Sequence, residues 1–282
     1  MNEKVVVITG VSTGIGASLS ETFLKDGYAV CGTVRKVEDA EQLAKQYPEK
    51  FTALVMDVTH QESVENAAMI VRDKFRNGID VLINNAGIAV GGPLLHVPLA
   101  EVSYQMQVNV IGVLGVCQAF AQMLKPNDQK KTGGKILMMS SVSGKIGMPF
   151  IGPYSASKHA LEGLSSSLRR ELIKDMIDVI IIGPGAVKTP IWDKSIRPVK
   201  EGYEDTSYAR AIQTFQKVFV ESAIKTGLSP EYLAQQVLKI AKKAKPKTRY
   251  SFVAKRLTNW IAPRYLPTRW IDQVLAKQLF SK

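Results

Sequence analysis

Two hydrophobic patterns take turns along most of the chain. Short runs of β-branched and apolar residues have the length of strands buried on both faces, and the stretches between them repeat apolar residues with helical periodicity. Strands are predicted at residues 4–9, 28–34, 51–56, 81–83, 135–139 and 179–182, and a seventh at 249–253. Helices are predicted at residues 17–25, 61–75, 99–124, 154–174 and 230–244. This alternation predicts one α/β domain over residues 1–282, with a doubly wound parallel sheet of about seven strands, helices on both faces and a C-terminal helical extension.

A glycine-rich turn joins the first predicted strand to the first predicted helix. Its spacing from Gly10 to Gly16 is Gly-x-x-x-Gly-x-Gly. Backbone N–H groups at the start of a helix after such a turn bind a pyrophosphate. Glycines serve ordinary turns too, but here the required strand and helix lie on either side. The turn therefore predicts a dinucleotide site, with Gly10, Ser12, Thr13, Gly14, Ile15 and Gly16 as its binding residues.

The end of the second predicted strand carries cations where an NAD site carries an acidic residue. The residue that recognises the ribose is expected about 20 residues past the glycines. This chain has Val34, Arg35 and Lys36 there. Two cations match a 2′-phosphate, and Ser12 offers it a hydroxyl, so the predicted cofactor is NADP(H). The alternative is that Arg35 is a solvated charge at the end of a strand.

A hydroxyl, a phenol and an amine lie close together in the sequence at Ser141, Tyr154 and Lys158. Tyr154 and Lys158 are an i, i+4 pair on a helix predicted to begin near Pro153. A nearby ammonium and the positive helix N-terminus both favour the phenolate, so we expect the pKa of Tyr154 to fall below about 10. Such a tyrosine gives or takes a proton near neutral pH, while Ser141 holds a substrate oxygen. The alternative is a buried tyrosine and a solvated lysine that share a helix by chance.

The bulk composition is that of an ordinary globular protein, with 282 residues, 45% hydrophobic and 22% charged. Cys31 and Cys117 lie in apolar segments and are predicted to be buried thiols, which fits a reducing, cytoplasmic compartment. No signal segment and no apolar run of about 18 residues is expected. The histidines lack metal-ligand spacing, so no metal is predicted. The net charge of +12 indicates an anionic ligand or surface. Nucleic acid is not predicted, because no basic run carries interleaved aromatic residues.

Together these motifs resemble those of the short-chain dehydrogenase/reductase family. Tyr154 follows Ser141 by 13 residues, as in that family, and the resemblance covers about residues 4–190. No catalytic position departs from the family's pattern. The matching residues, in the family's order, are Thr9-Gly10, Gly14-Ile15-Gly16, Asp57, Asn84-Asn85-Ala86-Gly87, Asn109, Ser141, Tyr154, Lys158 and Pro184-Gly185. The resemblance implies a Rossmann-type fold.

The resemblance also implies a role for each of these residues. Tyr154 is the expected acid and base, Lys158 lowers its pKa and binds the nicotinamide ribose, and Ser141 holds the substrate oxygen. Asn109 positions a water in a proton relay; taken alone, it is interpreted as a structural residue with buried partners. Further cofactor contacts are expected from Arg35, Lys36, Asp57, Val58, Asn85, Ala86, Gly87, Pro184, Gly185, Val187 and Thr189. Without the family, Asp57 is also interpretable as a cap and residues 84–87 as an Asn/Gly turn.

Two segments past the shared core carry further predictions. Residues 190–228 are rich in aromatic and apolar residues and, by the resemblance, form a lid over the substrate; the alternative is a pair of surface helices. Residues 246–282 form a basic amphipathic extension that resembles the tail of steroid and retinol dehydrogenases. Residues 245–282 hold nine basic residues and one acid, and so most of the net charge. We expect the apolar face to cover the core or the substrate site; contact with an anionic membrane is the alternative.

The sequence therefore predicts an NADP(H)-dependent oxidoreductase that interconverts a secondary alcohol and a ketone. Apolar residues after Ser141 and in the tail indicate a bulky steroid-, retinoid- or lipid-like substrate. A homo-oligomer, dimer or tetramer, is expected. The rival hypothesis is a catalytically silent regulator that binds NADP(H). The intact set of Ser141, Tyr154 and Lys158 argues against it, since a site without turnover needs none of the three.

Overall fold

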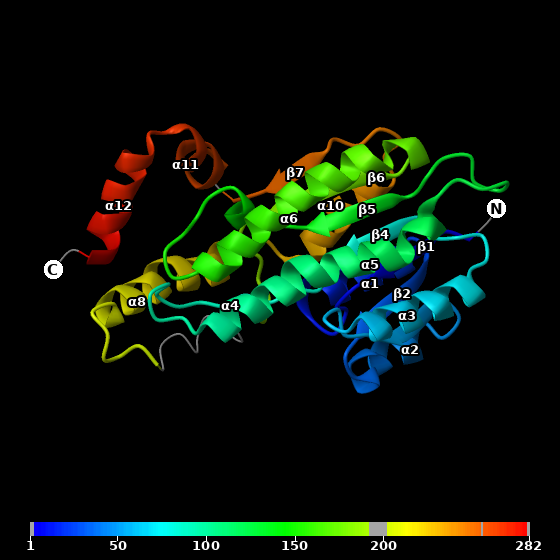
Figure 1. Cartoon of the computed structure of the whole chain (residues 1–282), viewed down its shortest axis with the longest axis horizontal. Helices are drawn as coiled ribbons and strands as arrows, with labels where there is room; N and C mark the ends of the chain where they lie inside the picture. Colours follow the sequence, from blue (N-terminus) through cyan, green and yellow to red (C-terminus); the bar gives the residue numbers. More distant parts are fainter. Residues whose placement is uncertain (1–2, 192–201, 255, 281–282) are drawn as a thin grey trace.

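One parallel sheet forms the centre of the molecule. The computed structural model describes residues 3–191, 202–254 and 256–280 (Figure 1). Within them the strands are β1 (Val5–Ile8), β2 (Ala29–Val34), β3 (Phe51–Val55), β4 (Val81–Asn84), β5 (Lys135–Met139), β6 (Asp178–Pro184) and β7 (Arg249–Phe252). Their order in the sheet is β3-β2-β1-β4-β5-β6-β7, and each neighbouring pair is parallel. The predicted α/β fold and its seventh strand are confirmed.

Helices connect the strands and cover the sheet. The described helices are α1 (Gly14–Lys25), α2 (Glu41–Gln46), α3 (Gln61–Lys74), α4 (Leu99–Met106), α5 (Gly112–Phe120), α6 (Gly152–Glu171), α8 (Ala209–Phe215), α9 (Glu221–Thr226), α10 (Pro230–Ala241), α11 (Ala262–Tyr265) and α12 (Thr268–Phe280). The start of α10 follows the expected local rule, because Ser229 accepts a hydrogen bond from the Tyr232 N–H and Pro230 follows the cap. The short α2 was not predicted.

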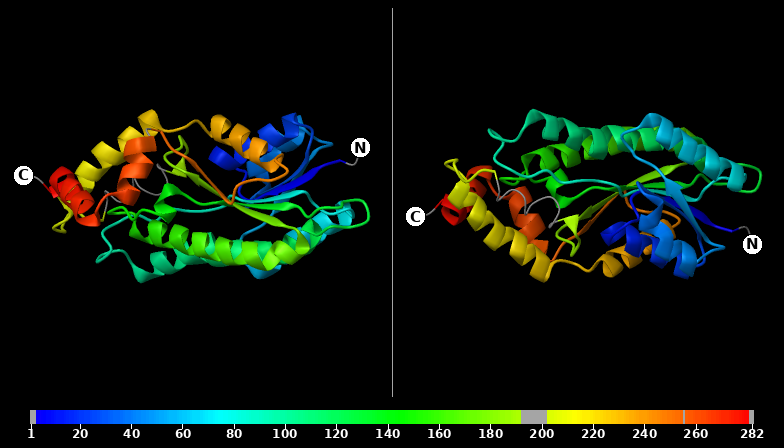
Figure 2. Two further views of the ribbon diagram at one scale, coloured as in Figure 1. Left: turned by 90° about the horizontal axis from the view of Figure 1, so that it is seen from above. Right: turned by 90° about the horizontal axis from the view of Figure 1, so that it is seen from below.

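Alternate residues of each central strand face opposite layers of helices (Figure 2). In β1, Val6 and Ile8 belong to a core cluster with residues of α1, α2 and α10. Val5 and Val7 belong to the cluster on the other face, with residues of α3, α5 and α6. All four side chains are buried. Burial on both faces explains why these strands are continuous apolar runs in the sequence.

The longest helical run carries part of this core. It comprises α4, a π-helical turn (Gln107–Ile111), α5 and a 3₁₀ turn (Ala121–Leu124). Among the described residues, this run alone is long and apolar enough to cross a membrane by length and composition, so the expectation that no segment meets that criterion is wrong. Half of its most apolar window is buried. Val113, Val116 and Phe120 pack in the core, which identifies the run as a core helix.

The C-terminal extension lies at the end of the molecule where α8 runs (Figure 1). After a π-helical turn (Leu257–Ile261) it forms α11 and α12. Leu279 of α12 is buried in a cluster with Ile212 and Phe215 of α8, and Trp260 is buried as well. The extension therefore packs on the protein through Leu279 and Trp260, and its predicted covering of the core or the substrate site stays a prediction. Residues 192–201 of the predicted lid and residues 255 and 281–282 of the extension lie outside the described residues.

Candidate active site

A large cavity opens where the strand order reverses. From β1 the chain adds β2 and β3 on one side and β4 to β7 on the other, which leaves a crevice past the carboxyl ends of β1 and β4. The cavity has a volume of about 460 Å³ and reaches from the glycine-rich turn to Ser141, Tyr154 and Lys158. It brings together every predicted site residue except Lys36 and Asn109. These two are the departures from the predicted site.

The glycine-rich turn has the geometry that a dinucleotide needs. Gly10 and Gly14 have φ values of +71° and +60°, where glycine is favoured. A Cβ on Gly16 would lie 1.9 Å from the Gly10 carbonyl oxygen, so only glycine fits. The α1 N-terminus has no side-chain cap and no acidic residue in its first turn, which leaves its N–H groups free for a pyrophosphate. The residues present therefore fit a dinucleotide cofactor.

Side chains from β1, β2 and the turn after β4 hold the glycine-rich turn in place. Thr33 Oγ1 accepts a hydrogen bond from the Gly10 N–H at 3.1 Å. Asn85 Nδ2 donates to the Thr9 and Gly10 carbonyl oxygens at 2.9 and 3.0 Å. Thr9 Oγ1 accepts from the Asn85 and Ala86 N–H groups, both at 2.9 Å. These cross-links explain the residue types at both turns, although no cofactor contact of Asn85 follows from them.

The two cations after β2 do not share one position. Arg35 is exposed and lines the cavity, whereas Lys36 is exposed outside the lining. The carboxylate of Asp39 also borders the cavity, from the 3₁₀ turn that follows β2. Asp57 accepts hydrogen bonds from the Thr59 N–H at 2.9 Å and from Thr59 Oγ1 at 2.7 Å. Burial by itself raises the Asp57 pKa, but these bonds, with charges including Arg35, bring it below its ordinary value.

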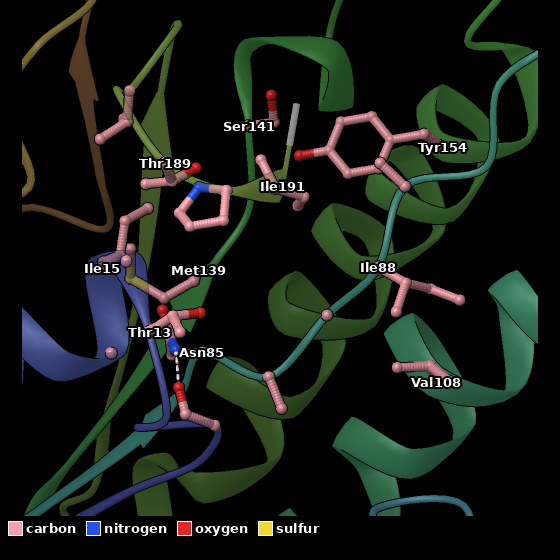
Figure 3. Close-up of a pocket in the computed structure, with 18 of the residues that line it drawn as sticks. Thr13, Ile15, Asn85, Ile88, Val108, Met139, Ser141, Tyr154, Thr189 and Ile191 are labelled. Carbon is pink, nitrogen blue, oxygen red and sulfur yellow. Dashed lines mark hydrogen bonds between the residues drawn. The ribbon is translucent and has the colours of Figure 1, made fainter. Parts of the chain in front are cut away.

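The side chains predicted to be catalytic follow the end of β5 and lie at the start of α6. Ser141 accepts a hydrogen bond from the Ser143 N–H at 3.1 Å, which caps the short 3₁₀ turn that follows it. Ser141 and Tyr154 both line the cavity, and the Ser141 hydroxyl lowers the pKa of Tyr154. Figure 3 shows the Tyr154 hydroxyl pointing into the cavity toward Ser141 and Ile191. A small oxygen-bearing group placed between them meets both hydroxyls.

The protonation of Tyr154 and Lys158 departs from the prediction. Burial raises the pKa of Tyr154, and the Ser141 hydroxyl opposes that rise. Burial lowers the pKa of Lys158 to about 8. The Lys158 ammonium lies 5.6 Å from the centroid of the Tyr154 ring and donates to the Met139 carbonyl oxygen at 2.8 Å. The expected lowering of the Tyr154 pKa is therefore wrong, because desolvation outweighs the effect of Ser141.

Asn109 has partners for its whole amide in the core. Its Oδ1 accepts from the Ile88 N–H at 2.9 Å, and its Nδ2 donates to the Ile88 carbonyl oxygen at 2.9 Å and to Ser157 Oγ at 3.1 Å. It lies in the π-helical turn between α4 and α5 and is fully buried. This arrangement fixes the loop after Gly87 and agrees with the structural alternative. The role of Asn109 in a proton relay stays a prediction.

An aromatic cluster covers the substrate end of the cavity. Phe150 and Ile151, from the loop after Ser141, pack with Ile212 and Phe215 of α8, and Tyr154 is partly buried against them. The Phe150 and Phe215 ring centroids are 5.6 Å apart in an edge-to-face arrangement. The described part of residues 190–228 thus lies next to Tyr154.

Sequence reasoning missed several residues of the cavity wall. The additional lining residues are Thr33, Val34, Asp39, Met56, Ile88, Ala89, Tyr104, Val108, Met139, Ser140, Val142, Ser143, Ala186, Pro190 and Ile191, whereas Ile151 was expected near the reacting centre. Met139 and Ser140 were open to prediction, because they directly precede Ser141 at a strand end. Tyr104 and Val108 are an i, i+4 pair, but the face of the helix that they share is known only from the fold.

Comparisons with known proteins agree with this geometry. A sequence model described as short chain dehydrogenase matches residues 4–199. The NADPH-dependent 3-dehydrocapnine reductase of Ornithobacterium rhinotracheale is 38% identical over 280 residues, 98% of this chain and 97% of the relative. The 3-ketodihydrosphingosine reductase of Bacteroides thetaiotaomicron is 34% identical over 251 residues, 87% of this chain and 86% of the relative.

A solved structure also matches nearly the whole chain. The short-chain dehydrogenase from Streptomyces avermitilis has a TM-score of 0.78 and 25% sequence identity, and the match covers 98% of this chain and 95% of the other. With the family match and the two reductases, this confirms the predicted family and the prediction of an NAD(P)-dependent oxidoreductase. The chain belongs to the short chain dehydrogenase family.

Proposed function

We propose that this protein reduces a ketone to a secondary alcohol with NADPH. The observation that carries the proposal is that Ser141 and Tyr154 line one cavity together with the glycine-rich turn (Figure 3). The preference for NADPH is supported by Arg35 at the cavity edge, where no carboxylate occupies the strand-end position, and by the NADPH-dependent relative. The residues that would hold the cofactor are the glycine-rich turn, Arg35, Asp57 and the residues after β4 and β6.

In the proposed reaction the ketone oxygen lies against two hydroxyls. NADPH, when bound, supplies the hydride for the carbonyl carbon. Tyr154 gives its proton to the ketone oxygen, and Ser141 donates a hydrogen bond to the same atom. A raised Tyr154 pKa keeps the phenol protonated at neutral pH, which suits the donor in the reductive direction. Lys158, whose pKa is lowered to about 8, is a source from which the phenolate regains a proton.

The substrate that we propose is a long-chain 3-keto lipid of the sphingoid kind. Two relatives are named as reductases of 3-dehydrocapnine and 3-ketodihydrosphingosine. Apolar side chains from four parts of the fold line the cavity near Tyr154, namely Ile88, Val108, Ile151 and Ile191. The aromatic cluster with α8 extends this apolar surface, and we propose that residues 190–228 close over the lipid chain. Steroid and retinoid ketones are the other candidates.

The test follows the absorbance of NADPH with a panel of ketones. We expect turnover of a 3-keto long-chain lipid, a higher KM when its chain is shortened, and little turnover of steroid or retinoid ketones. NADH serves as the cofactor control, and Tyr154→Phe serves as the control for the site. Tight NADPH binding without turnover of any ketone would instead support the silent regulator.

The exposed side of the C-terminal extension supports a proposed contact with an anionic membrane. Leu257, Tyr265 and Trp270 are 73%, 74% and 61% exposed. Arg264 and Arg269 are exposed beside them on α11 and α12. Exposed aromatic and apolar side chains flanked by cations are typical of helices that lie on anionic lipid. The extension packs on α8 through Leu279, so the same membrane would deliver a lipid ketone near the cavity.

A cytoplasmic location and a homo-oligomer complete the proposal. Cys31 and Cys117 are free, buried thiols, which suits a reducing compartment. Ile111 is 54% exposed on the outer side of the helical run from α4 to α5, and Tyr104 is 43% exposed about two turns earlier. We propose that this face joins two copies into a dimer or tetramer. Light scattering of the wild type and of Ile111→Glu tests this proposal. The molar mass of the variant's assembly is expected to be smaller than that of the wild type.

A further inference from the structure

A buried carboxylate lies behind the catalytic serine, outside the cavity lining. Glu162 is on α6, two turns past Tyr154, and only 5% of its surface is exposed. Its Oε1 accepts a hydrogen bond from Ser140 Oγ at 2.9 Å. A Cβ on Gly144 would lie 2.8 Å from Ser140 Oγ and 3.0 Å from Glu162 Cγ, so the glycine at this position leaves room for the contact between Ser140 and Glu162. The carboxylate therefore packs against Ser140, the residue that directly precedes Ser141.

Arg249 of β7 holds the same carboxylate from the opposite side. Its Nε lies 3.1 Å from both Glu162 oxygens, and its Nη2 lies 3.0 Å from Oε1. Nη2 also donates to the main-chain carbonyl oxygen of Ser141 at 3.4 Å. A Cβ on Gly183 would lie 2.4 Å from Nη2, so glycine on β6 lets the guanidinium cross the neighbouring strand. One guanidinium thus joins Glu162 to the backbone of the catalytic serine.

The helical part of the C-terminal extension, which follows β7, covers this guanidinium. The Cζ of Arg249 lies 4.6 Å from the centroid of the Trp260 ring, and the Cζ of Arg264 lies 5.3 Å from it. Trp260 is 6% exposed, although it belongs to a segment with exposed neighbours. A buried cation–π contact restricts where the guanidinium can lie. The extension therefore reaches Ser141 through a continuous series of contacts, from Trp260 to Arg249 and Glu162.

We propose that Glu162 and Arg249 are positioning residues that fix the Ser141 hydroxyl against Tyr154, and that Trp260 makes the extension part of this support. The proposal rests on the proposed function, in which Ser141 holds the ketone oxygen. Neither charged residue lines the cavity, so both act through residues 140 and 141. A buried ion pair adds little net stability, because desolvation offsets its attraction. We therefore assign the Glu162–Arg249 pair to the positioning of Ser141 rather than to stability.

The test compares Arg249→Lys and Glu162→Gln with the wild type. Lysine keeps the charge but loses the paired geometry of the guanidinium. We expect kcat to fall by about tenfold to a hundredfold, since a misplacement of about 1 Å costs about 10²-fold, while the Kd for NADPH stays unchanged. Trp260→Leu is expected to lower kcat in the same direction by less. Arg170→Lys is the matched control, because Arg170 is on α6 and its hydrogen bonds go to Ser166 of the same helix.

A second measurement needs neither cofactor nor substrate. The ultraviolet absorbance of each variant, minus that of the same variant with Tyr154→Phe, gives the pKa of Tyr154. The Ser141 hydroxyl lowers this pKa, so a displaced serine raises it. We expect Arg249→Lys and Glu162→Gln to shift the pKa upward, in the direction of Ser141→Ala, and Arg170→Lys to leave it unchanged.

The outcomes separate positioning from mere structure. The proposal would be overturned if Arg249→Lys and Glu162→Gln both kept the Tyr154 pKa and the kcat of the wild type. So would a loss of thermal stability and NADPH affinity together, with no change in the Tyr154 pKa, because that result describes a structural ion pair. If the wild type turns over no ketone, the proposed function fails, while the Tyr154 titration still decides whether Glu162 and Arg249 position Ser141.

Discussion

The Lys158 ammonium donates a hydrogen bond to the carbonyl oxygen of Met139 at 2.8 Å, the residue that ends β5 two positions before Ser141. The amine is 6% exposed, and burial lowers its pKa to about 8 from an ordinary value of 10.5. Burial therefore makes the charged form less favourable in the folded protein than in the unfolded chain, although the amine is still mostly protonated at pH 7 and donates to the Met139 carbonyl oxygen. This relationship has a consequence for stability as well as for catalysis.

Lys158→Met is expected to be more stable than the wild type at neutral pH and to lose that advantage in alkali. Between pH 8 and 10.5 the unfolded lysine binds more protons than the folded one, so wild-type stability rises with pH through Lys158. Below pH 8 the burial of the charged Lys158 amine lowers the free energy of unfolding by its full amount. This amount is roughly 3 kcal/mol, at about 1.4 kcal/mol per pKa unit. Urea unfolding of both proteins at several pH values measures the difference.

Comparison with the variant isolates the lysine from other groups. Burial raises the pKa of both Cys31 and Cys117 to about 12, so the thiols destabilise the folded protein as pH rises above 9, opposite in sign to Lys158. Both proteins share that effect. A difference between wild type and Lys158→Met that stays constant from pH 7 to pH 10.5 would contradict the lowered pKa of the Lys158 amine.

Tyr154→Phe is expected to keep NADPH binding and to lose most turnover. The hydroxyl is the proposed proton donor at the ketone oxygen, and general acid catalysis contributes about 10²–10⁴-fold. The ring packs against the aromatic cluster with α8, and phenylalanine preserves that contact. Single-turnover rates with a 3-keto lipid and NADPH titration measure the two effects. Near-normal turnover in this variant would remove Tyr154 from the mechanism.

Local sequence patterns predicted the fold well because its strands are buried on both faces. Val5 to Ile8 and Ile180 to Ile182 are apolar runs that have no other stable place in a soluble chain. The site was predicted from spacing, since Tyr154 and Lys158 share one turn and the glycines need a fixed backbone. The pKa of Tyr154 was not, because spacing gives charges but not desolvation.

Ion pairs between residues far apart in the chain could not be predicted from the sequence for a related reason. Glu162 and Arg249 are 87 positions apart, and each reads as a solvated charge in its own segment. Their pairing depends on β7 lying beside β6, and on Gly183 letting the guanidinium cross. Asp39 was missed likewise, because an acidic residue in a short exposed turn carries no signal of the cavity behind it.

The protein is expected to co-sediment with anionic vesicles through its extension. Changing Leu257, Tyr265 and Trp270 together to Gln removes apolar contact and keeps every charge, so binding should fall at all salt concentrations. Ile173→Gln is the matched control, since Ile173 is 65% exposed in the 3₁₀ turn after α6. Binding should also weaken with added salt, because each cation near the surface contributes about 1 kcal/mol. Wild-type protein that stays in the supernatant at low salt would exclude the membrane contact.

Arg35 is expected to set the preference for NADPH over NADH. Arg35 lines the cavity, Val34 precedes it, and the strand-end position has no carboxylate for a ribose hydroxyl. A guanidinium meets a 2′-phosphate with charge-assisted hydrogen bonds, which contribute about 1.5–3 kcal/mol each. Arg35→Ala should therefore weaken NADPH by roughly tenfold to a thousandfold, at about 1.4 kcal/mol per decade. NADH, which has no phosphate to lose, should bind as before.

Neighbouring side chains supply the controls for Arg35. Lys36→Ala removes an adjacent exposed cation outside the cavity lining and should weaken NADPH only slightly, through long-range charge. Asp39→Asn removes a carboxylate at the cavity edge, so it should strengthen NADPH and leave NADH unchanged. Val34→Asp with Arg35→Ala should move the preference to NADH, because the new carboxylate repels the phosphate and accepts a hydrogen bond from the ribose. Fluorescence titration gives both Kd values. If Arg35→Ala weakens both cofactors equally, Arg35 is only a solvated charge at a strand end.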